Sequence, residues 1–490
     1  MVLNRSARFI MITATPETNA SAAKTSIAAA DNYDPKQFDW PLAYDAEKFL
    51  QGRIAAFLQR NSLAQTLAAR MRDETATDFF EWVDHLVLTP DDEEILRILG
   101  FTTDTNAETP KGETVLHHPR ATLPRVILRS DQQRNPSIVA LRPEWVADFV
   151  ARHNVDGAID GAPLSRYRRV VVHVEDGTTL EAVERNAYRG FVSAPHKPGQ
   201  LEAVVKTREM WFTRKRFFEN DAEGFELADR LLNLSIPLVG RDRTCQIFFE
   251  AERAWWESRN RAARIQKFRQ DQLGLGWGNH DHHTFRSSRE HFVDLTDFLL
   301  KLGFEKRERY YAGAEAGWGA QISEQSVAGI VVFADVDLMP DETQIDFSSN
   351  RLPVASKLGT VGLWVGLHGE SFLGAGMHHL EARFDYPLLR DQLKQEGVNT
   401  MNPFSNFEFL RQAFTEGERW PVNRTRAERL RAAGLITDAQ CEKFTTEGAL
   451  GSHLENLQRH GGFKGFNQKS VSVVISATDP RKNHFQQAAA

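Results

Sequence analysis

The stretch that decides the fold runs from residue 282 to residue 303 and reads HHTFRSSREHFVDLTDFLLKLG. Residues 282–287 favour a short strand, and the apolar spacing that follows predicts an amphipathic helix over 292–302. Gly303 directly after this pattern is a typical helix stop. Later strands are expected at 319–323 and at the apolar run 327–333. The predicted order is therefore a strand, a helix and then further strands.

The same order occurs again towards the C-terminus. A strand is expected at 376–384, followed by a helix over 386–395 that Gly397 ends. Its later strands are predicted near 407–420 and at 470–475. Because one such unit cannot bury both of its faces, we expect two of them to close around a shared cleft. The predicted class is α+β, built from paired βαβββ modules with an added helical segment.

The N-terminal half shows this order in a weaker form. A strand is expected at 82–88, and Thr89-Pro90 has the capping chemistry that begins a helix. A further copy is expected to begin with a strand at 167–174, with a turn at Asp176-Gly177 and a helix over 178–186.

Four segments follow from these patterns. Residues 1–35 are expected to form a disordered tail, since the apolar patch inside them is too short for a signal-peptide core. Residues 36–204 are expected to form an N-terminal α+β domain of degenerate βαβββ modules, and 205–273 a helical linker. Residues 274–490 are expected to hold the paired modules.

Composition narrows the class of partner. The chain of 490 residues has a net charge of −6, which gives no electrostatic case for binding nucleic acid or an anionic membrane surface. No apolar run approaches the roughly 18–20 residues that cross a bilayer. The only cysteines, Cys245 and Cys441, cannot make a disulfide framework or a zinc motif, so a cytoplasmic setting is expected. The oligomeric state does not follow from the sequence.

Two histidine–arginine pairs carry the first chemical signal. Alternate residues of a strand share one face, so His282 and Arg286 are expected to point together. His379 and Arg383 repeat the same spacing at the head of the second module. An imidazole can bind a metal ion, and a guanidinium can hold a carboxylate in a bidentate clamp. The repetition favours a metal site over two polar strands that are rich in histidine by chance.

A carboxylate pair follows the second histidine. Glu416 and Glu418 are predicted to share one strand face. Two imidazoles and one carboxylate form the facial triad of non-haem Fe(II) sites, which leaves coordination positions open. By itself a Glu-x-Glu sequence is more often a solvated face, and only its place in the second module makes it a candidate.

This half of the chain resembles the 2-oxoadipate dioxygenase/decarboxylase family, the hydroxyglutarate synthases, which belong to the vicinal-oxygen-chelate superfamily of paired βαβββ modules. Residues 282–286, HHTFR, are similar to the family motif His-x-x-[Ile/Phe]-Arg. Residues 378–383, HHLEAR, resemble Asn-His-Leu-Thr-Pro-Arg, and residues 414–420, FTEGERW, resemble Phe-Gly-Glu-x-Glu-Gln-Arg-Gly. The resemblance covers roughly residues 275–490.

The resemblance implies an Fe(II) site. It makes His282 and His379 the imidazole ligands, with Glu418 ahead of Glu416 as the third ligand. Neither Asp281 nor Glu381 is expected to orient an imidazole, because we place both on the opposite strand faces.

The resemblance also implies a substrate. The family uses O₂ to convert a 2-oxo acid into CO₂ and a 2-hydroxy acid that is one carbon shorter. Arg286 would hold a substrate carboxylate, supported by Arg383, and Lys469 and Ser470 would line the pocket. Two residues depart from the family pattern: Lys469 stands where the family has a small apolar residue, and His378 stands where it has an Asn. The resemblance therefore supports the metal site more strongly than the identity of the substrate.

Three alternatives stay open at this point. One is another vicinal-oxygen-chelate enzyme, such as an extradiol-type dioxygenase or a glyoxalase-type isomerase. A second is a hydrolase built on the cluster His280-Asp281-His282-His283, and a third is a binding protein without catalysis. In the N-terminal half, His85 lacks an arginine four residues later, so a structural module is expected there.

Overall fold

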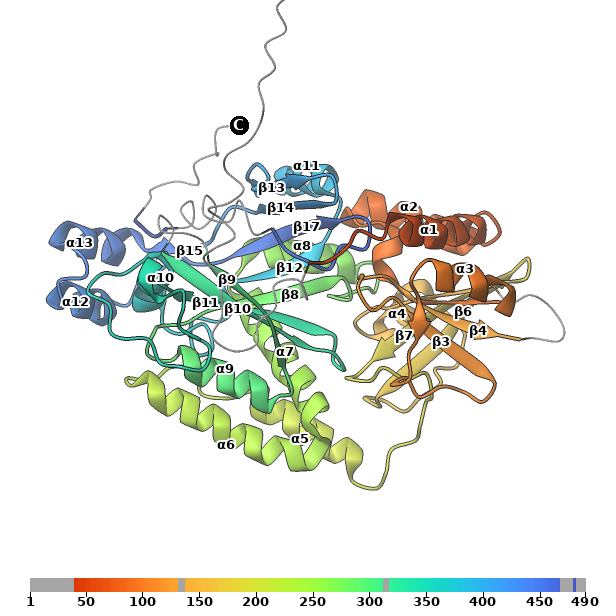
Figure 1. The fold of residues 1–490 in the computed structure, drawn as a ribbon, viewed down its shortest axis with the longest axis horizontal. Coiled ribbons are helices and arrows are strands. Elements are labelled where there is room, and N and C mark those ends of the chain that lie inside the picture. The colour runs from red at the N-terminus through yellow and green to blue at the C-terminus, as the bar shows by residue number, and fades with distance from the viewer. Residues whose placement is uncertain (1–38, 131–136, 312–316, 468–478, 482–490) are drawn as a thin grey trace, which may run out of the picture.

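Two mixed β-sheets lie side by side in the protein, with helices around them (Figure 1). The computed structural model describes residues 39–130, 137–311, 317–467 and 479–481. Each sheet contains two consecutive units of a strand, a helix and further strands. The predicted α+β class with paired βαβββ modules is therefore confirmed. The predicted tail at 1–35 lies outside the described residues.

The first sheet belongs to the N-terminal half of the chain. Its elements and flanking helices are α1 (Tyr44–Leu58), α2 (Ser62–Thr75), η2 (Phe79–Trp82), β1 (Val83–Leu88), η3 (Pro90–Asp92), α3 (Glu93–Ile98), β2 (Thr102–Thr103), β3 (Glu113–His117), β4 (Arg125–Arg129), β5 (Ser137–Leu141), α4 (Val146–His153), β6 (Tyr167–Glu175) and β7 (Thr178–Arg185). The seven strands lie in the order β2-β3-β4-β1-β5-β7-β6. The two units meet where β1 and β5 pair antiparallel.

The second unit of this sheet differs from the sequence prediction. It begins at β5, and residues 178–186, which we expected to be helical, contain strand β7. Asp176 and Gly177 have φ angles of 42° and 67°. Two consecutive positive φ angles are typical of a two-residue type I′ hairpin turn, so β6 turns directly back into β7.

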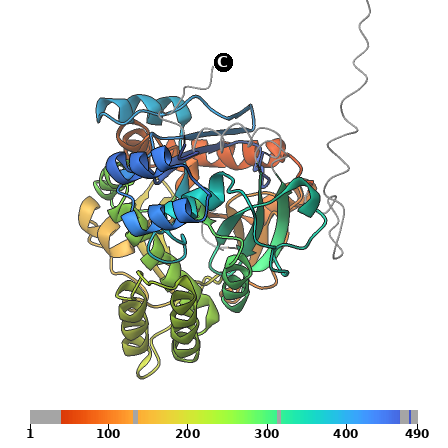
Figure 2. The ribbon, with the colours of Figure 1, turned by 90° about the vertical axis from the view of Figure 1, so that its left-hand side faces the viewer.

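A helical layer joins the two sheets in sequence. It consists of α5 (Gln200–Phe212), α6 (Asp221–Val239), α7 (Arg241–Ser258) and α8 (Arg261–Asp271), as the helical pattern of 205–273 predicted. In the view of Figure 2, α5 and α6 project from the body as a pair. α7 lies closer to the second sheet, and its Phe249 packs edge-on against Phe285 of that sheet, with 6.1 Å between the ring centroids.

The second sheet carries the two modules that the sequence marked most clearly. Its elements are β8 (His280–Arg286), α9 (Phe292–Lys301), β9 (Glu305–Tyr311), β10 (Trp318–Gln325), β11 (Ile330–Asp337), η4 (Pro340–Glu342), α10 (Thr360–His368), β12 (His379–Arg383), α11 (Tyr386–Gln395), β13 (Ser405–Phe407), β14 (Leu410–Phe414) and β17 (His453–Arg459). The strand order is β13-β14-β17-β12-β8-β11-β10-β9. β8 and β12, the first strands of the two modules, pair antiparallel at the centre.

The last strand of the second module comes after an insertion. Between β14 and β17 the chain forms β15 (Arg419–Trp420), α12 (Arg424–Ala432), α13 (Asp438–Glu447) and β16 (Ala449–Leu450). β15 and β16 form a separate two-stranded sheet. The sequence prediction missed β17 behind this insertion, as it missed β9 in the first module. The strand predicted at 470–475 lies outside the described residues.

The loop before β12 is fixed by side chains of the helical layer. The backbone carbonyls of residues 372–375 accept hydrogen bonds from Arg214, Arg216 and Arg259, one of them from Arg214 Nη2 to the carbonyl of Phe372 at 2.6 Å. Glu252, which is fully buried, accepts hydrogen bonds from Arg214 and Arg216 at 2.9 Å each. A loop without strand partners thus has its buried carbonyls satisfied, as burial requires.

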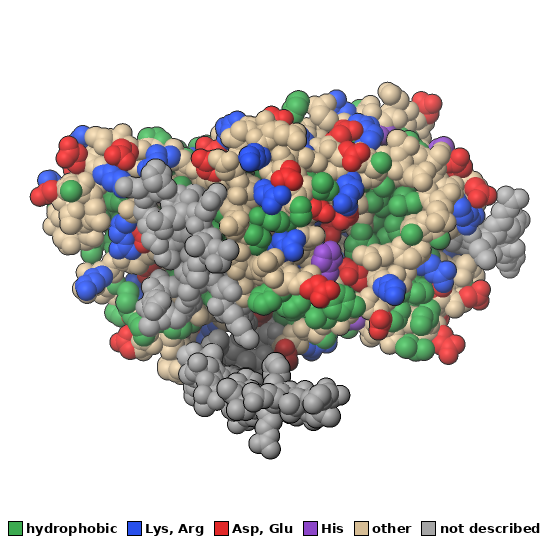
Figure 3. Space-filling model, turned by 90° about the horizontal axis from the view of Figure 1, so that it is seen from above, with side chains coloured by type: hydrophobic (Ala, Val, Ile, Leu, Met, Phe, Trp, Pro, Cys, Tyr) green, Lys and Arg blue, Asp and Glu red, His purple; other side chains and the backbone are tan. Residues whose placement is uncertain are grey.

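On the face seen from above, basic and acidic side chains are interspersed (Figure 3). Among the helices that the structure describes, none combines the length and the apolar character that a membrane span requires.

Candidate metal centre

A cavity lies on one face of the second sheet. His282 and Arg286, which were predicted to share one face of a strand, both line it from β8, together with Thr284 between them. The other lining residues come from both modules and are Glu308, Tyr310, Trp318, Ile322, Phe333, Asp335, His378, His379, Glu381, Phe404, Gln412, Phe414, Glu455, Phe466 and Asn467.

Two imidazoles and two carboxylates converge in this cavity. In the strand register, Glu381 of β12 stands directly opposite His282 of β8, and Glu455 of β17 stands beside Glu381. Glu381 Oε2 is in contact with His282 Nε2. His379 Nε2 lies 2.9 Å from Glu455 Oε2 and 3.8 Å from Glu381 Oε2. All four side chains are buried.

This set fits a divalent transition-metal ion. Ligand atoms bound at ~2.1 Å lie ~3 Å apart at a right angle and ~4.2 Å apart when they are opposite. The separations of His379 Nε2 from Glu455 and Glu381, 2.9 and 3.8 Å, fall at and within these limits. Glu381 Oε2 is buried and forms no hydrogen bond of normal geometry, and its contact with His282 Nε2 is closer than two ligands of one ion can lie, so these two side chains would move apart when an ion binds. The atoms of His282, His379 and Glu381 that could bind an ion lie within 4.8 Å of one another.

The groups behind the candidate ligands hold them in place. The Gln412 amide nitrogen donates to Oε1 of Glu381 at 3.1 Å and to Oε1 of Glu455 at 2.9 Å, so the Oε2 atoms are left to face the histidines. His282 Nδ1 lies 3.1 Å from Asp281 Oδ1. Such partners fix the orientation of an imidazole or carboxylate ligand.

Our expectation for Asp281 and Glu381 was therefore wrong. Asp281 reaches the ring of its own neighbour, His282, which adjacent residues can do when the backbone is locally irregular; the β8–β12 register shifts at this point. Glu381 shares a face with His379 because it follows that histidine by two residues, which is the period of a strand.

Burial and mutual repulsion set the charge of the carboxylate pair. Burial and the neighbouring Glu455 raise the pKa of Glu381 well above its usual range. Burial also acts to raise the pKa of Glu455, but the hydrogen bond and charge of His379 outweigh it and lower that pKa. Two carboxylates this close share a proton more readily than both ionise. Burial lowers the pKa of His282 to about 4, so this imidazole is neutral, as a metal ligand must be.

Arg286 and Asp335 form the other polar end of the cavity. They are register partners on the parallel strands β8 and β11. Burial lowers the pKa of Arg286 to about 10, against the effect of Asp335, and burial raises the pKa of Asp335 to about 7, against the effect of Arg286. Between the two polar ends the wall is largely aromatic. The cavity can therefore hold a molecule with an anionic group at one end and metal-binding atoms at the other.

The predicted carboxylates lie elsewhere. Glu416 is exposed and accepts a hydrogen bond from Asn399, and Glu418 Oε1 accepts one from the backbone N–H of Arg261. Neither lines the cavity. The expectation that one of them stands beside His282 and His379 was wrong, because strand β14 ends at Phe414, before both glutamates.

The remaining predicted site residues divide into two groups. Arg383 lies outside the cavity lining and pairs with Glu81 of the N-terminal half, with 3.3 Å between Nη1 and Oε2. Lys469 and Ser470 lie outside the described residues.

A signal for the carboxylates that line the cavity was present in the sequence. His-Leu-Glu occurs at residues 379–381 and again at 453–455. In the parallel register of β12 and β17, His379 pairs with His453 and Glu381 with Glu455. The repeat could have been read as two strands that present the same pair of side chains to one site.

Of the cluster that suggested a hydrolase, His280 and His283 lie outside the cavity, with 5.4 Å between their ring centroids. His280 Nδ1 lies 2.8 Å from the carbonyl oxygen of Trp277, and His283 packs against Phe249 on the opposite face of β8, with 4.8 Å between the ring centroids. In the N-terminal sheet, His85 Nδ1 contacts Asp84 at 2.7 Å, and Arg185 pairs with the same carboxylate. The groups that could hold an ion, among the residues described, all belong to the second sheet.

Comparison with known proteins gives only distant matches. No family model matches the chain, and no curated protein sequence matches it. A mutant of 4-hydroxymandelate synthase from Streptomyces coelicolor aligns at 12% identity over 81% of this chain and 96% of that chain, with a TM-score of 0.26. Methylmalonyl-CoA epimerase from Mycobacterium tuberculosis aligns at 12% identity over 37% of this chain and 88% of that chain, with a TM-score of 0.22. A protein from Shewanella frigidimarina designated a hydrolase aligns at 16% identity over 43% of this chain and 91% of that chain, with a TM-score of 0.29. The assignment of paired βαβββ modules rests on the strand order and register of this chain itself.

Proposed function

We propose that the protein is an Fe(II)-dependent enzyme that uses O₂ to convert a 2-oxo acid into CO₂ and a 2-hydroxy acid one carbon shorter. The observation that carries the proposal is the convergence of His282 and His379 with the Glu381–Glu455 pair in one buried cavity. Two imidazoles and a carboxylate form the set that suits non-haem Fe(II). When bound, the ion supplies the redox chemistry with O₂ that no protein side chain supplies.

The protein's own groups have three roles in this proposal. His282, His379 and one carboxylate of the Glu381–Glu455 pair would hold the ion. Arg286 binds a carboxylate of the substrate through its guanidinium, in the planar geometry that suits such a pair. Lying four residues after His282 on β8, it stands ~13 Å further along the strand. We therefore propose a 2-oxo acid with a second carboxylate, of the 2-oxoadipate type, held at both ends.

The walls of the cavity exclude water. Phe333, Phe414 and Phe466 lie around the histidines, with Phe333 at 4.6 Å and Phe466 at 5.0 Å from the His282 ring and Phe414 at 5.1 Å from the His379 ring. An apolar wall limits the access of solvent to reactive species and strengthens electrostatic interactions within the site. The second carboxylate of the pair is placed to hold or accept a proton beside the substrate.

That second carboxylate also supports one alternative. A glyoxalase-type isomerase needs a metal ion and a carboxylate base but no oxygen, and Glu381 beside Glu455 could serve as the base. Oxygen consumption separates the two, because an isomerase consumes none.

The direct test is oxygen uptake by the Fe(II)-reconstituted protein across a panel of 2-oxo acids of increasing length, with and without a second carboxylate. We expect uptake with equimolar CO₂, strongest with a dicarboxylic 2-oxo acid. His379→Ala should abolish uptake, whereas Glu418→Gln, a matched carboxylate outside the cavity, should not. Uptake that persists in His379→Ala, or no uptake with any member of the panel, would overturn the proposal.

A further inference from the structure

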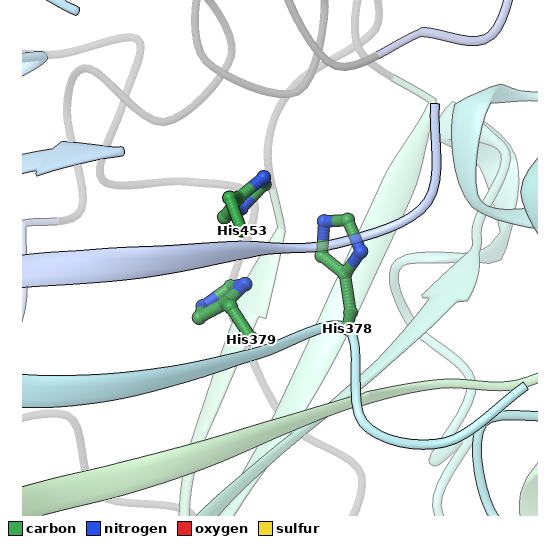
Figure 4. A group of neighbouring side chains, drawn as sticks. All are labelled: His378, His379 and His453. Carbon is green, nitrogen blue, oxygen red and sulfur yellow. The ribbon is translucent and has the colours of Figure 1, made fainter. Parts of the chain in front are cut away.

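A second group of buried histidines lies next to the first. His378, His379 and His453 come from the starts of β12 and β17, with the rings of His379 and His453 one above the other and that of His378 beside them (Figure 4). Their exposed fractions are 1, 7 and 0%. One nitrogen from each of the three rings lies within 4.8 Å of the other two.

The spacing of the rings fits one shared ion. Their centroids are 4.6 Å apart for His378 and His453, 5.1 Å for His379 and His453, and 5.2 Å for His378 and His379. With a metal–nitrogen bond of ~2.1 Å, an ion stands ~3.2 Å from each ring centroid, so two bound rings are ~4.6 Å apart at a right angle and ~5.3 Å apart at a tetrahedral angle. All three separations fall in this interval. The His379 and His453 rings are stacked with 22° between their planes, so one of them would turn to bring its nitrogen onto the shared ion.

The hydrogen-bonding state of the rings also points to a ligand. His378 Nε2, His379 Nδ1 and both nitrogens of His453 are buried without a hydrogen-bond partner. Buried polar atoms are rarely left in this state, and each such atom needs an explanation. His378 Nδ1 lies 3.1 Å from the carbonyl oxygen of Gly451, a contact that places the proton on Nδ1 and leaves the Nε2 lone pair to bind.

The surroundings favour neutral, nitrogen-only ligation. Phe414 stacks on His453 at 3.9 Å, and Trp364 lies edge-on to His378 at 5.4 Å. Imidazoles in a dry site suit Zn²⁺ better than Mg²⁺ or Ca²⁺, which prefer oxygen.

We propose that His378, His379 and His453 form a second metal site, which binds Zn²⁺ and shares His379 with the candidate iron site. His379 Nε2 faces Glu455 in the iron site, so the nitrogen left for the second ion is Nδ1. With both ions bound, the His379 ring would hold one ion at each nitrogen, as an imidazolate. Binding of the second ion therefore releases the Nδ1 proton to solvent, one proton for each Zn²⁺.

The test is the number of Zn²⁺ ions bound by the metal-free full-length protein after equilibrium dialysis, because Zn²⁺ can enter both sites. The wild type should bind two ions per chain. His453→Phe keeps the aromatic stack on Phe414 and should bind one, and His282→Gln should also bind one, through the other site. His379→Gln should bind neither ion tightly. In His282→Gln, the X-ray absorption spectrum of the bound Zn²⁺ should show nitrogen ligands from imidazoles.

Two controls keep the result clear. His283→Gln removes a buried histidine from the opposite face of β8 and should leave two ions bound. Where His453→Phe fails to fold, as judged by circular dichroism, His378→Asn replaces it, with the same expected loss of one ion. The second site would be overturned if the wild type binds only one Zn²⁺ ion per chain and if His453→Phe and His378→Asn still bind that ion. Two ions retained in His282→Gln would instead overturn the first site, so the two failures are distinguishable.

Discussion

Glu381 and His282 are register partners on β12 and β8, the two antiparallel strands at which the modules of the second sheet meet. His282 lies on the first strand of one module and Glu381 on the first strand of the other. The pairing brings an imidazole of one module against the carboxylate of the other, and His379 and Glu455 close the set from β12 and β17. Neither module alone holds the candidate ligands, so the site depends on the pairing of the two units.

The first prediction concerns Gln412, whose amide donates to both carboxylates. Gln412→Leu should weaken Fe(II) binding by about 10–100-fold, the usual effect of removing a group that orients a ligand. Anaerobic titration with Fe(II) measures the change. Gln458→Leu, at a glutamine of β17 that lies outside the cavity lining, is the control and should bind Fe(II) as the wild type does. Equal Fe(II) affinities in the two variants would show that Gln412 does not orient the ligands.

The second prediction separates the two arginines that the sequence marked. Arg286→Gln should raise the KM for a 2-oxo acid by about 10–150-fold, which corresponds to the ~1.5–3 kcal/mol of a hydrogen bond to a charged group. Arg383→Gln should leave KM unchanged and lower the free energy of unfolding, because Arg383 pairs with Glu81 rather than with the cavity. Steady-state kinetics and urea denaturation measure the two effects. A KM effect in Arg383→Gln alone would reverse the assignment.

The third prediction is a pH dependence of stability that arises from Asp335. Burial raises its pKa from 3.8 to about 7, so the folded state binds the proton more tightly than the unfolded chain does. The stability from this group is fully present below pH ~4 and is lost as the pH rises to ~7, by roughly 4 kcal/mol at most. Urea denaturation of the metal-free protein between pH 4 and 8 measures it. Asp335→Asn should flatten this part of the profile, and an unchanged slope in the variant would exclude Asp335 as its cause.

The fourth prediction concerns the clamp on the loop before β12. Glu252 is fully buried between Arg214 and Arg216, whose other hydrogen bonds go to the loop carbonyls. Glu252→Gln should lower the free energy of unfolding by about 3–5 kcal/mol, because it leaves two buried cations without a counter-charge. Glu226→Gln, which breaks an exposed pair with Arg230, should change it by less than about 0.5 kcal/mol. A loss for Glu252→Gln as small as that of the control would show that the clamp does not fix the loop.

The sequence predicted the second sheet better than the first. The helix at 386–395 was predicted with its observed bounds, and the strands that carry His282 and His379 were found, because apolar periodicity and glycine stops are local signals. The prediction failed where a strand pairs with a distant partner. β7 was predicted to be a helix, because its strand conformation depends on its pairing with β6 through the intervening turn. β17 was missed because an insertion of two helices separates it from the rest of its module in the sequence.

The residues of the candidate site were also predicted only in part, for the same reason. The two histidines followed from a repeated spacing within a strand, and Arg286 followed from the same strand face. Which carboxylates reach the histidines depends on which strands pair in the sheet, and the spacing of residues along one strand does not predict that pairing. Glu418 was favoured because it follows the histidine in sequence, whereas Glu455 reaches the site from 74 positions further along than Glu381, through the pairing of β17 with β12.

The most direct test of the central claim compares two double variants in anaerobic Fe(II) binding. Glu381→Gln with Glu455→Gln removes both carboxylates that face the histidines, and Glu416→Gln with Glu418→Gln removes two that do not. The account predicts that the first variant, folded by circular dichroism, loses Fe(II) affinity by at least about 100-fold, while the second binds as the wild type does. Loss of iron from the second variant, with full binding in the first, would contradict it.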